Sequence, residues 1–121
     1  MFVTKIFEFE ACHHLPHYKG ACHNLHGHSY KLEVTVGGTI KEDGNKRGMV
    51  IDFKDLKKIV KEVAVDKYDH ANLNDFFPNP TAEIMVEQIA LDIMENLPTE
   101  VFLDSVKLWE TSTSYAEYRY I

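Results

Sequence analysis

Regular alternation of apolar and polar side chains predicts most of the secondary structure of this chain. Four segments alternate with the two-residue period of a strand that has one buried face; they are residues 2–13, 28–37, 105–111 and 115–121. A short fifth strand is predicted at 49–53 (MVIDF), returning from a turn at 41–48 that contains two glycines.

Two further segments have the apolar spacing of an amphipathic helix. The first begins after Asp52, a predicted N-cap, and continues to about residue 64. The second runs from about Thr81 to Asn96, and either Asn79 or Thr81 could cap it. The order ββααββ predicts an α+β fold in which two helices pack on one face of an antiparallel sheet. We expect residues 1–121 to form a single domain, since no linker or repeat interrupts them.

The charge and the cysteine content of the chain argue against several classes of protein. The formal net charge of −6 argues against a nucleic-acid partner, and no run of 18 apolar residues predicts a membrane span. The first residues lack the pattern of a secretory signal, so we expect a cytoplasmic protein. Its two cysteines are then expected as reduced thiols; a Cys12–Cys22 disulfide is the less favoured alternative.

Six of the seven histidines and both cysteines lie between residues 12 and 29. Strand parity selects three of these histidines, because His13 continues the inward face of the first strand, and His26 and His28 that of the second. A single histidine there would more often be a core or surface residue. Three that share an apolar face predict a metal site, and three imidazoles with an open fourth position are typical of catalytic zinc. Surface or supporting roles are expected for the others, which are His14, His17 and His23.

Cys22 and Gly27 lie beside these predicted ligands. Cys22 precedes His26 by four residues, and its spacing leaves two roles open. As a fourth ligand it would complete a structural zinc site; as a free thiol near a cation it would be a base or nucleophile. Gly27, between two ligands, is predicted to let the backbone approach the group bound by the metal.

Two acidic residues are candidates for proton transfer and ligand binding. Asp69 precedes His70, and a carboxylate in contact with an imidazole fixes its tautomer and raises its basicity, although adjacent residues need not touch. Glu110 ends the inward series of its strand and therefore needs a partner. A ligand edge with paired N–H donors would satisfy it; solvent or an ion pair with Arg119 are the alternatives.

The segments FEACHHLP, CHNLHGHSY, GMVIDFKDLK, YDHANLND, NPTAE and KLWETSTS occur in an order that resembles the superfamily of 6-pyruvoyltetrahydropterin and 6-carboxytetrahydropterin synthases. The resemblance implies the ββααββ tunnelling fold, and homohexamers of paired trimers with active sites between subunits. It assigns zinc to His13, His26 and His28, and catalysis to Cys22, Asp69 and His70, which decides against Cys22 as a ligand. It also implies that Glu110 anchors the amino-pyrimidine edge of a pterin, with Thr81 and Glu83 nearby.

The spacing between Cys22 and His26, three residues, is similar to that of the bacterial carboxytetrahydropterin synthases of the queuosine pathway. That likeness implies conversion of 7,8-dihydroneopterin triphosphate to 6-carboxy-5,6,7,8-tetrahydropterin, acetaldehyde and triphosphate, with zinc as the cofactor. One alternative is a pyruvoyl synthase that eliminates triphosphate from the same substrate. Another is a non-catalytic zinc-binding module with one cysteine and three histidine ligands.

Overall fold

The computed structural model describes residues 1–120, which form a five-stranded sheet in the order β3-β1-β2-β4-β5. The strands are β1 (Phe2–His13), β2 (His26–Gly38), β3 (Ala71–Asn72), β4 (Val101–Thr111) and β5 (Ser114–Arg119). Neighbours among β1, β2, β4 and β5 pair antiparallel, as the alternation predicted. The predicted last strand includes residue 121, which lies outside the described residues.

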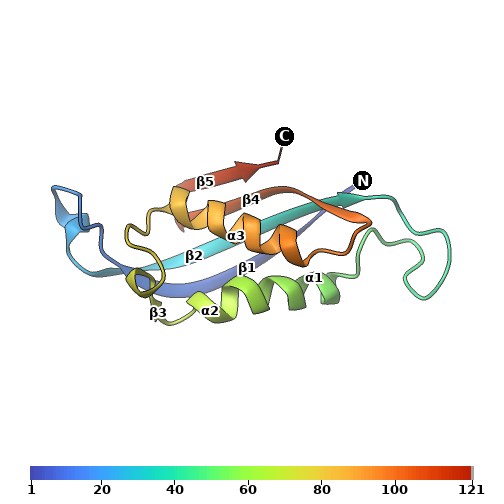
Figure 1. The fold of residues 1–121 in the computed structure, drawn as a ribbon, viewed down its shortest axis with the longest axis horizontal. Helices are drawn as coiled ribbons and strands as arrows, with labels where there is room; N and C mark the ends of the chain where they lie inside the picture. The colour runs from blue at the N-terminus through green and yellow to red at the C-terminus, as the bar shows by residue number, and fades with distance from the viewer. Residues whose placement is uncertain (121) are drawn as a thin grey trace.

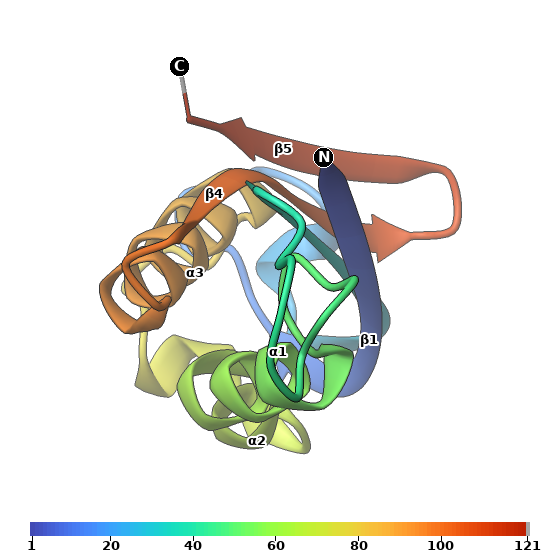
Figure 2. The ribbon, with the colours of Figure 1, turned by 90° about the vertical axis from the view of Figure 1, so that its right-hand side faces the viewer.

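Two helical segments cover one face of this sheet (Figures 1 and 2). The first comprises α1 (Phe53–Val60), a π-helical turn (Lys61–Val65) and α2 (Asp66–Tyr68); the second is α3 (Ala82–Asn96). Figure 2 shows α1 beside β1 and α3 beside β4, on the concave side of the sheet. The hydrophobic core lies between the helices and the sheet. It contains the inward-facing residues of the strands, such as Phe9, Leu32 and Leu108. Within the described residues no helix is long and apolar enough to cross a membrane.

Both helices begin at side-chain caps. Asp52 accepts a hydrogen bond from the Lys54 N–H, as predicted. At α3 the cap is Thr81, whose Oγ1 accepts from the Ile84 N–H at 3.2 Å, so the choice between Asn79 and Thr81 falls to Thr81.

The predicted strand at 49–53 is wrong, because residues 49–52 are irregular and Phe53 begins α1. Val50 and Ile51 are buried, which accounts for the apolar run, but they pack on the core without a partner strand. The loop closes instead through two backbone hydrogen bonds between Lys41 and residues 48 and 49. The fifth strand of the sheet is instead β3, which the sequence did not predict. It is two residues long and pairs in parallel with the end of β1.

The hairpin of β1 and β2 positions the histidines. Its register places His13 opposite His26 and Ala11 opposite His28, at the strand ends next to the loop 14–25. That loop projects from the end of the sheet opposite the loop 39–52 (Figure 1).

Candidate active site

The structure brings the three histidines selected by parity into one cluster. Each of His13, His26 and His28 offers one ligand atom, and these atoms all lie within 4.8 Å of one another. His13 is fully buried and the other two are half-buried. Among residues 1–120, Cys22 does not belong to this cluster.

Two backbone carbonyls fix the orientation and tautomer of two of these rings, His13 and His26. The Nδ1 of His13 lies 2.8 Å from the carbonyl oxygen of Pro80, and the Nδ1 of His26 lies 2.7 Å from that of Asn24. A carbonyl can only accept, so each Nδ1 carries a proton, and in the neutral tautomer that this fixes, the lone pair is on Nε2. These two Nε2 atoms are 3.1 Å apart, and the Nε2 of His28 is buried without a hydrogen-bond partner. Converging lone pairs repel one another unless a cation lies between them, and neutral imidazoles are the donors that zinc prefers.

Burial favours the neutral forms of His13 and His28. Desolvation is the largest influence on His13 and His28 and lowers the pKa of each below 6.5. The carboxylate of Glu110 opposes that shift, because its oxygens lie 3.8 Å from the His28 Nε2 and 4.0 Å from the His13 Nε2. Arg119 pairs with Glu117 instead, so the alternative ion pair between Glu110 and Arg119 is wrong.

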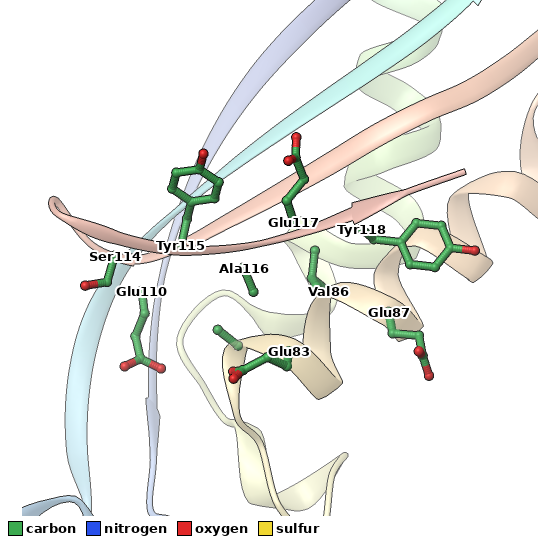
Figure 3. A pocket seen from close by; sticks show the side chains of 10 residues that line it. Glu83, Val86, Glu87, Glu110, Ser114, Tyr115, Ala116, Glu117 and Tyr118 are labelled. Carbon is green, nitrogen blue, oxygen red and sulfur yellow. The ribbon is translucent and has the colours of Figure 1, made fainter. Parts of the chain in front are cut away.

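Glu110 also lines a cavity of about 490 Å³ next to the cluster. The cavity is bounded by residues 82–87 of α3 and residues 114–118 of β5, and no lysine or arginine lines it. Figure 3 shows the side chains of Glu83 and Glu110 on the same side of β5, whereas Tyr115 and Glu117 point to the other side. Such a pocket favours a ligand edge that donates hydrogen bonds and disfavours an anion.

Thr81 and Glu83 both lie at the start of α3. The Oγ1 of Thr81 accepts the capping hydrogen bond, which leaves its hydroxyl proton free to donate. Glu83 is exposed in the first turn and lines the cavity, whereas Thr81 is not among the lining residues.

Cys22 occupies a 3-10 turn (Ala21–His23) in the loop between β1 and β2. Neither Cys22 nor Cys12 forms a disulfide, and both are half-buried. The Cys22 carbonyl accepts a hydrogen bond from the Leu15 N–H at 2.9 Å. Gly27, opposite Cys12, alternates to the face away from the histidine rings. Gly27 lines a cavity on the outer face together with Cys12 and the neighbouring His28. The approach of its backbone to a metal-bound group stays a prediction.

Asp69 and His70 contact each other directly. The Asp69 Oδ2 lies 3.1 Å from the His70 Nδ1, in a turn where His70 has a φ of +59°. The Glu10 N–H donates to the Asp69 Oδ1 at 2.9 Å, and this bond, aided by His70, lowers the pKa of Asp69. The exposed His70 lines the outer cavity, of about 400 Å³, together with Cys12 and Gly27.

Sequence reasoning missed the supporting residues. Pro80 and Asn24 act through backbone carbonyls, which carry no side-chain signature, and Asn74 contacts the main chain of His14 from sixty residues away. His14 is half-buried, whereas His17 and His23 are exposed.

Comparisons with known proteins found similar sequences. A family model described as 6-pyruvoyl tetrahydropterin synthase matches residues 2–120. The chain is 37% identical over 137 residues to the 6-carboxy-5,6,7,8-tetrahydropterin synthase of Haemophilus influenzae, covering 97% of each chain. It is 46% identical over 86 residues to the dihydroneopterin monophosphate aldolase of Pyrococcus furiosus, covering 71% of this chain and 70% of the relative.

The fold is also found among solved structures. That of the 6-pyruvoyl tetrahydropterin synthase of Caenorhabditis elegans has a TM-score of 0.85 at 26% identity, covering 100% of this chain and 96% of that one. This likeness confirms the predicted tunnelling fold.

Proposed function

Because the chain belongs to the 6-pyruvoyl tetrahydropterin synthase family, we propose that it is a zinc-dependent lyase acting on 7,8-dihydroneopterin triphosphate. The products are 6-carboxy-5,6,7,8-tetrahydropterin, acetaldehyde and triphosphate, and the atom balance requires one water. The observation that carries the proposal is the cluster of Nε2 lone pairs next to Glu110 and its acidic cavity. The amino-pyrimidine edge of a pterin has the paired N–H donors that this carboxylate accepts.

His13, His26 and His28 would hold the zinc ion through Nε2. When bound, zinc supplies Lewis-acid polarisation of the substrate's side-chain oxygens. Glu110 fixes the pterin ring, so that the side chain at C6 extends towards the histidines. Glu83 lines the same cavity, and Thr81, the N-cap of α3, lies two residues before it.

Cys22 and the Asp69–His70 pair serve as the groups that remove and return protons. The contact between Asp69 Oδ2 and His70 Nδ1 holds the imidazole with its other nitrogen free to exchange a proton. Thiol and imidazole lie on different segments, so they can act on opposite sides of the substrate chain.

The position of His70 supports active sites shared between copies of the chain, and we propose that these copies assemble as a homohexamer. In one chain His70 lines the outer cavity, whereas Glu110 lines the cavity on the helix side of the sheet. A site that needs both groups is completed when a second copy of the chain brings its outer cavity to the first. We further propose a cytoplasmic role in queuosine biosynthesis, the pathway that uses this product.

Product identification by mass spectrometry tests the reaction. The zinc-loaded protein is incubated with 7,8-dihydroneopterin triphosphate, and we expect 6-carboxytetrahydropterin and acetaldehyde in equal amounts. Release of triphosphate without acetaldehyde would show a pyruvoyl synthase instead. Carbon–carbon cleavage without loss of triphosphate would indicate an aldolase, the activity in the name of the Pyrococcus relative.

Alkylation of Cys22 tests the alternative of a non-catalytic zinc module. If Cys22 were a fourth ligand, alkylation would release zinc. We expect the alkylated protein to keep its zinc and lose turnover, and Cys22→Ala to behave in the same way. His26→Ala, which removes a ligand, is expected to lose the zinc.

A further inference from the structure

Residues 69–74 lie along the last residues of β1 and are attached to them at both ends. The parallel pairing itself is short, since only Ala11 with Ala71 and Cys12 with Asn72 are in register. Before it, Asp69 accepts a hydrogen bond from the Glu10 N–H. The His70 N–H also donates to the Glu10 carbonyl, so main-chain bonds contribute at this end. At residue 74 the ladder of backbone hydrogen bonds has ended, and a side chain holds the segment there.

Asn74 makes the attachment at the other end. The His14 N–H donates to the Asn74 Oδ1 at 2.9 Å, and the Asn74 Nδ2 donates to the His14 carbonyl at 3.0 Å. The carboxamide thus binds both main-chain groups of one residue, as a neighbouring strand would. Asn74 is itself held, because its N–H donates to the Asn72 Oδ1 at 3.1 Å.

The main chain at His14 is connected both to the histidine cluster and to the loop that carries the Cys22 thiol. It follows His13 directly, whose ring is fixed on its far side by the Pro80 carbonyl. The next residue, Leu15, donates its N–H to the Cys22 carbonyl and so closes the loop that carries the thiol. A shift of the main chain at His14 would move the His13 ring and the Cys22 loop together.

We propose that Asn74 is a positioning residue that holds the His14 main chain and thereby sets the places of His13 and Cys22. The catalytic part of this role rests on the proposed function, but the positions of a ligand and a thiol can be measured without substrate.

The test uses the full chain with the Cys12→Ser substitution, so that Cys22 is its one thiol. Asn74→Ala removes both hydrogen bonds; Asn74→Asp keeps the acceptor but loses the donor to the His14 carbonyl. Loss of the pair should raise the population of the open loop, and with it the iodoacetamide labelling rate of Cys22, about tenfold. Zinc affinity, from competition with a chromophoric chelator, should fall about tenfold. The aspartate variant should show a smaller change in the same direction.

Asn96→Ala is the matched control, because it removes a side-chain hydrogen bond to the Asp92 carbonyl at an exposed site in α3. It should leave Cys22 labelling and zinc affinity unchanged. Hydrogen exchange should accelerate at the His14 amide in the Asn74 variants and not across the whole sheet; equal acceleration everywhere would mean that Asn74 serves general stability and would overturn the inference. Wild-type labelling and zinc affinity in Asn74→Asp would overturn it as well, even if Asn74→Ala did not fold. If labelling and affinity change as expected but no pterin is converted, the proposed function fails and the positioning role stands.

Discussion

Replacing Glu110 with glutamine separates the charge of this side chain from its size. The carboxylate lies at the end of β4, 3.8 Å from the His28 Nε2, and its side chain is 29% exposed. We expect Glu110→Gln to bind zinc in the normal ratio but to lose most of its turnover. Glutamine keeps one acceptor oxygen and replaces the other with a donor, which would face an N–H of the pterin edge.

The size of the loss follows from those two hydrogen bonds. Each bond to a charged acceptor contributes roughly 1.5–3 kcal/mol, and glutamine forfeits one bond and weakens the other. A loss of about 3 kcal/mol in transition-state binding corresponds to a decrease of about 10²-fold in kcat/KM. The rings of His13 and His28 stay neutral in this variant, because Glu110 is a group that raises the pKa of each.

The assay is steady-state kinetics by product formation, with zinc content measured on the same samples. Glu87→Gln is the control, because Glu87 lines the same cavity from α3 and undergoes the same change of charge. We expect its kcat/KM to stay within about twofold of the unaltered protein. The reasoning is refuted if Glu110→Gln retains kcat/KM to within about threefold, or if both substitutions cost the same.

Three further predictions concern stability. At a zinc concentration about a thousandfold above its Kd, binding adds about 4 kcal/mol, so a chelator should lower Tm by roughly 10–20 °C in a thermal melt; an unchanged Tm would argue against the metal site. Thr81→Val should cost about 1 kcal/mol in urea unfolding because the Ile84 N–H loses its acceptor, whereas Thr81→Ser should not; equal stability of the two would contradict the cap. The pKa values of His13 and His28 lie below 6.5 in the fold, so the unfolded chain binds more protons once the pH falls below about 6.5. The metal-free protein should therefore keep its full stability above that pH and lose it towards pH 5, and a urea midpoint that does not change between the two would refute this.

The parity of strands made the histidine cluster predictable. Alternation is a local property, and once β1 and β2 pair as a hairpin the direction of His13, His26 and His28 follows from it. Alternation likewise predicted that Glu110 lies on the helix side of β4. Capping preferences, which are also local, gave Thr81 as one of two candidate caps for α3.

What the sequence could not provide depends on contacts between distant segments. Val50 and Ile51 look like a strand because they are apolar, yet a strand also needs a free edge to pair with. The two-residue β3 has no periodicity to detect, and whether Asp69 touches His70 depends on one positive φ angle. The sequence cannot indicate that the carbonyls of Pro80 and Asn24 bind the histidine rings, because every residue has a carbonyl.

All three predicted ligands lie on the β1–β2 hairpin, and this has a consequence for the order of folding. His13 and His28 are fifteen residues apart in the chain, whereas the Pro80 carbonyl that orients His13 is 67 residues away. The loop closed by an ion is therefore short, and we expect its closure to precede the docking of α3. An ion held by the hairpin would stabilise the transition state for folding as well as the native state. Zinc should then increase the rate of refolding, in addition to slowing unfolding.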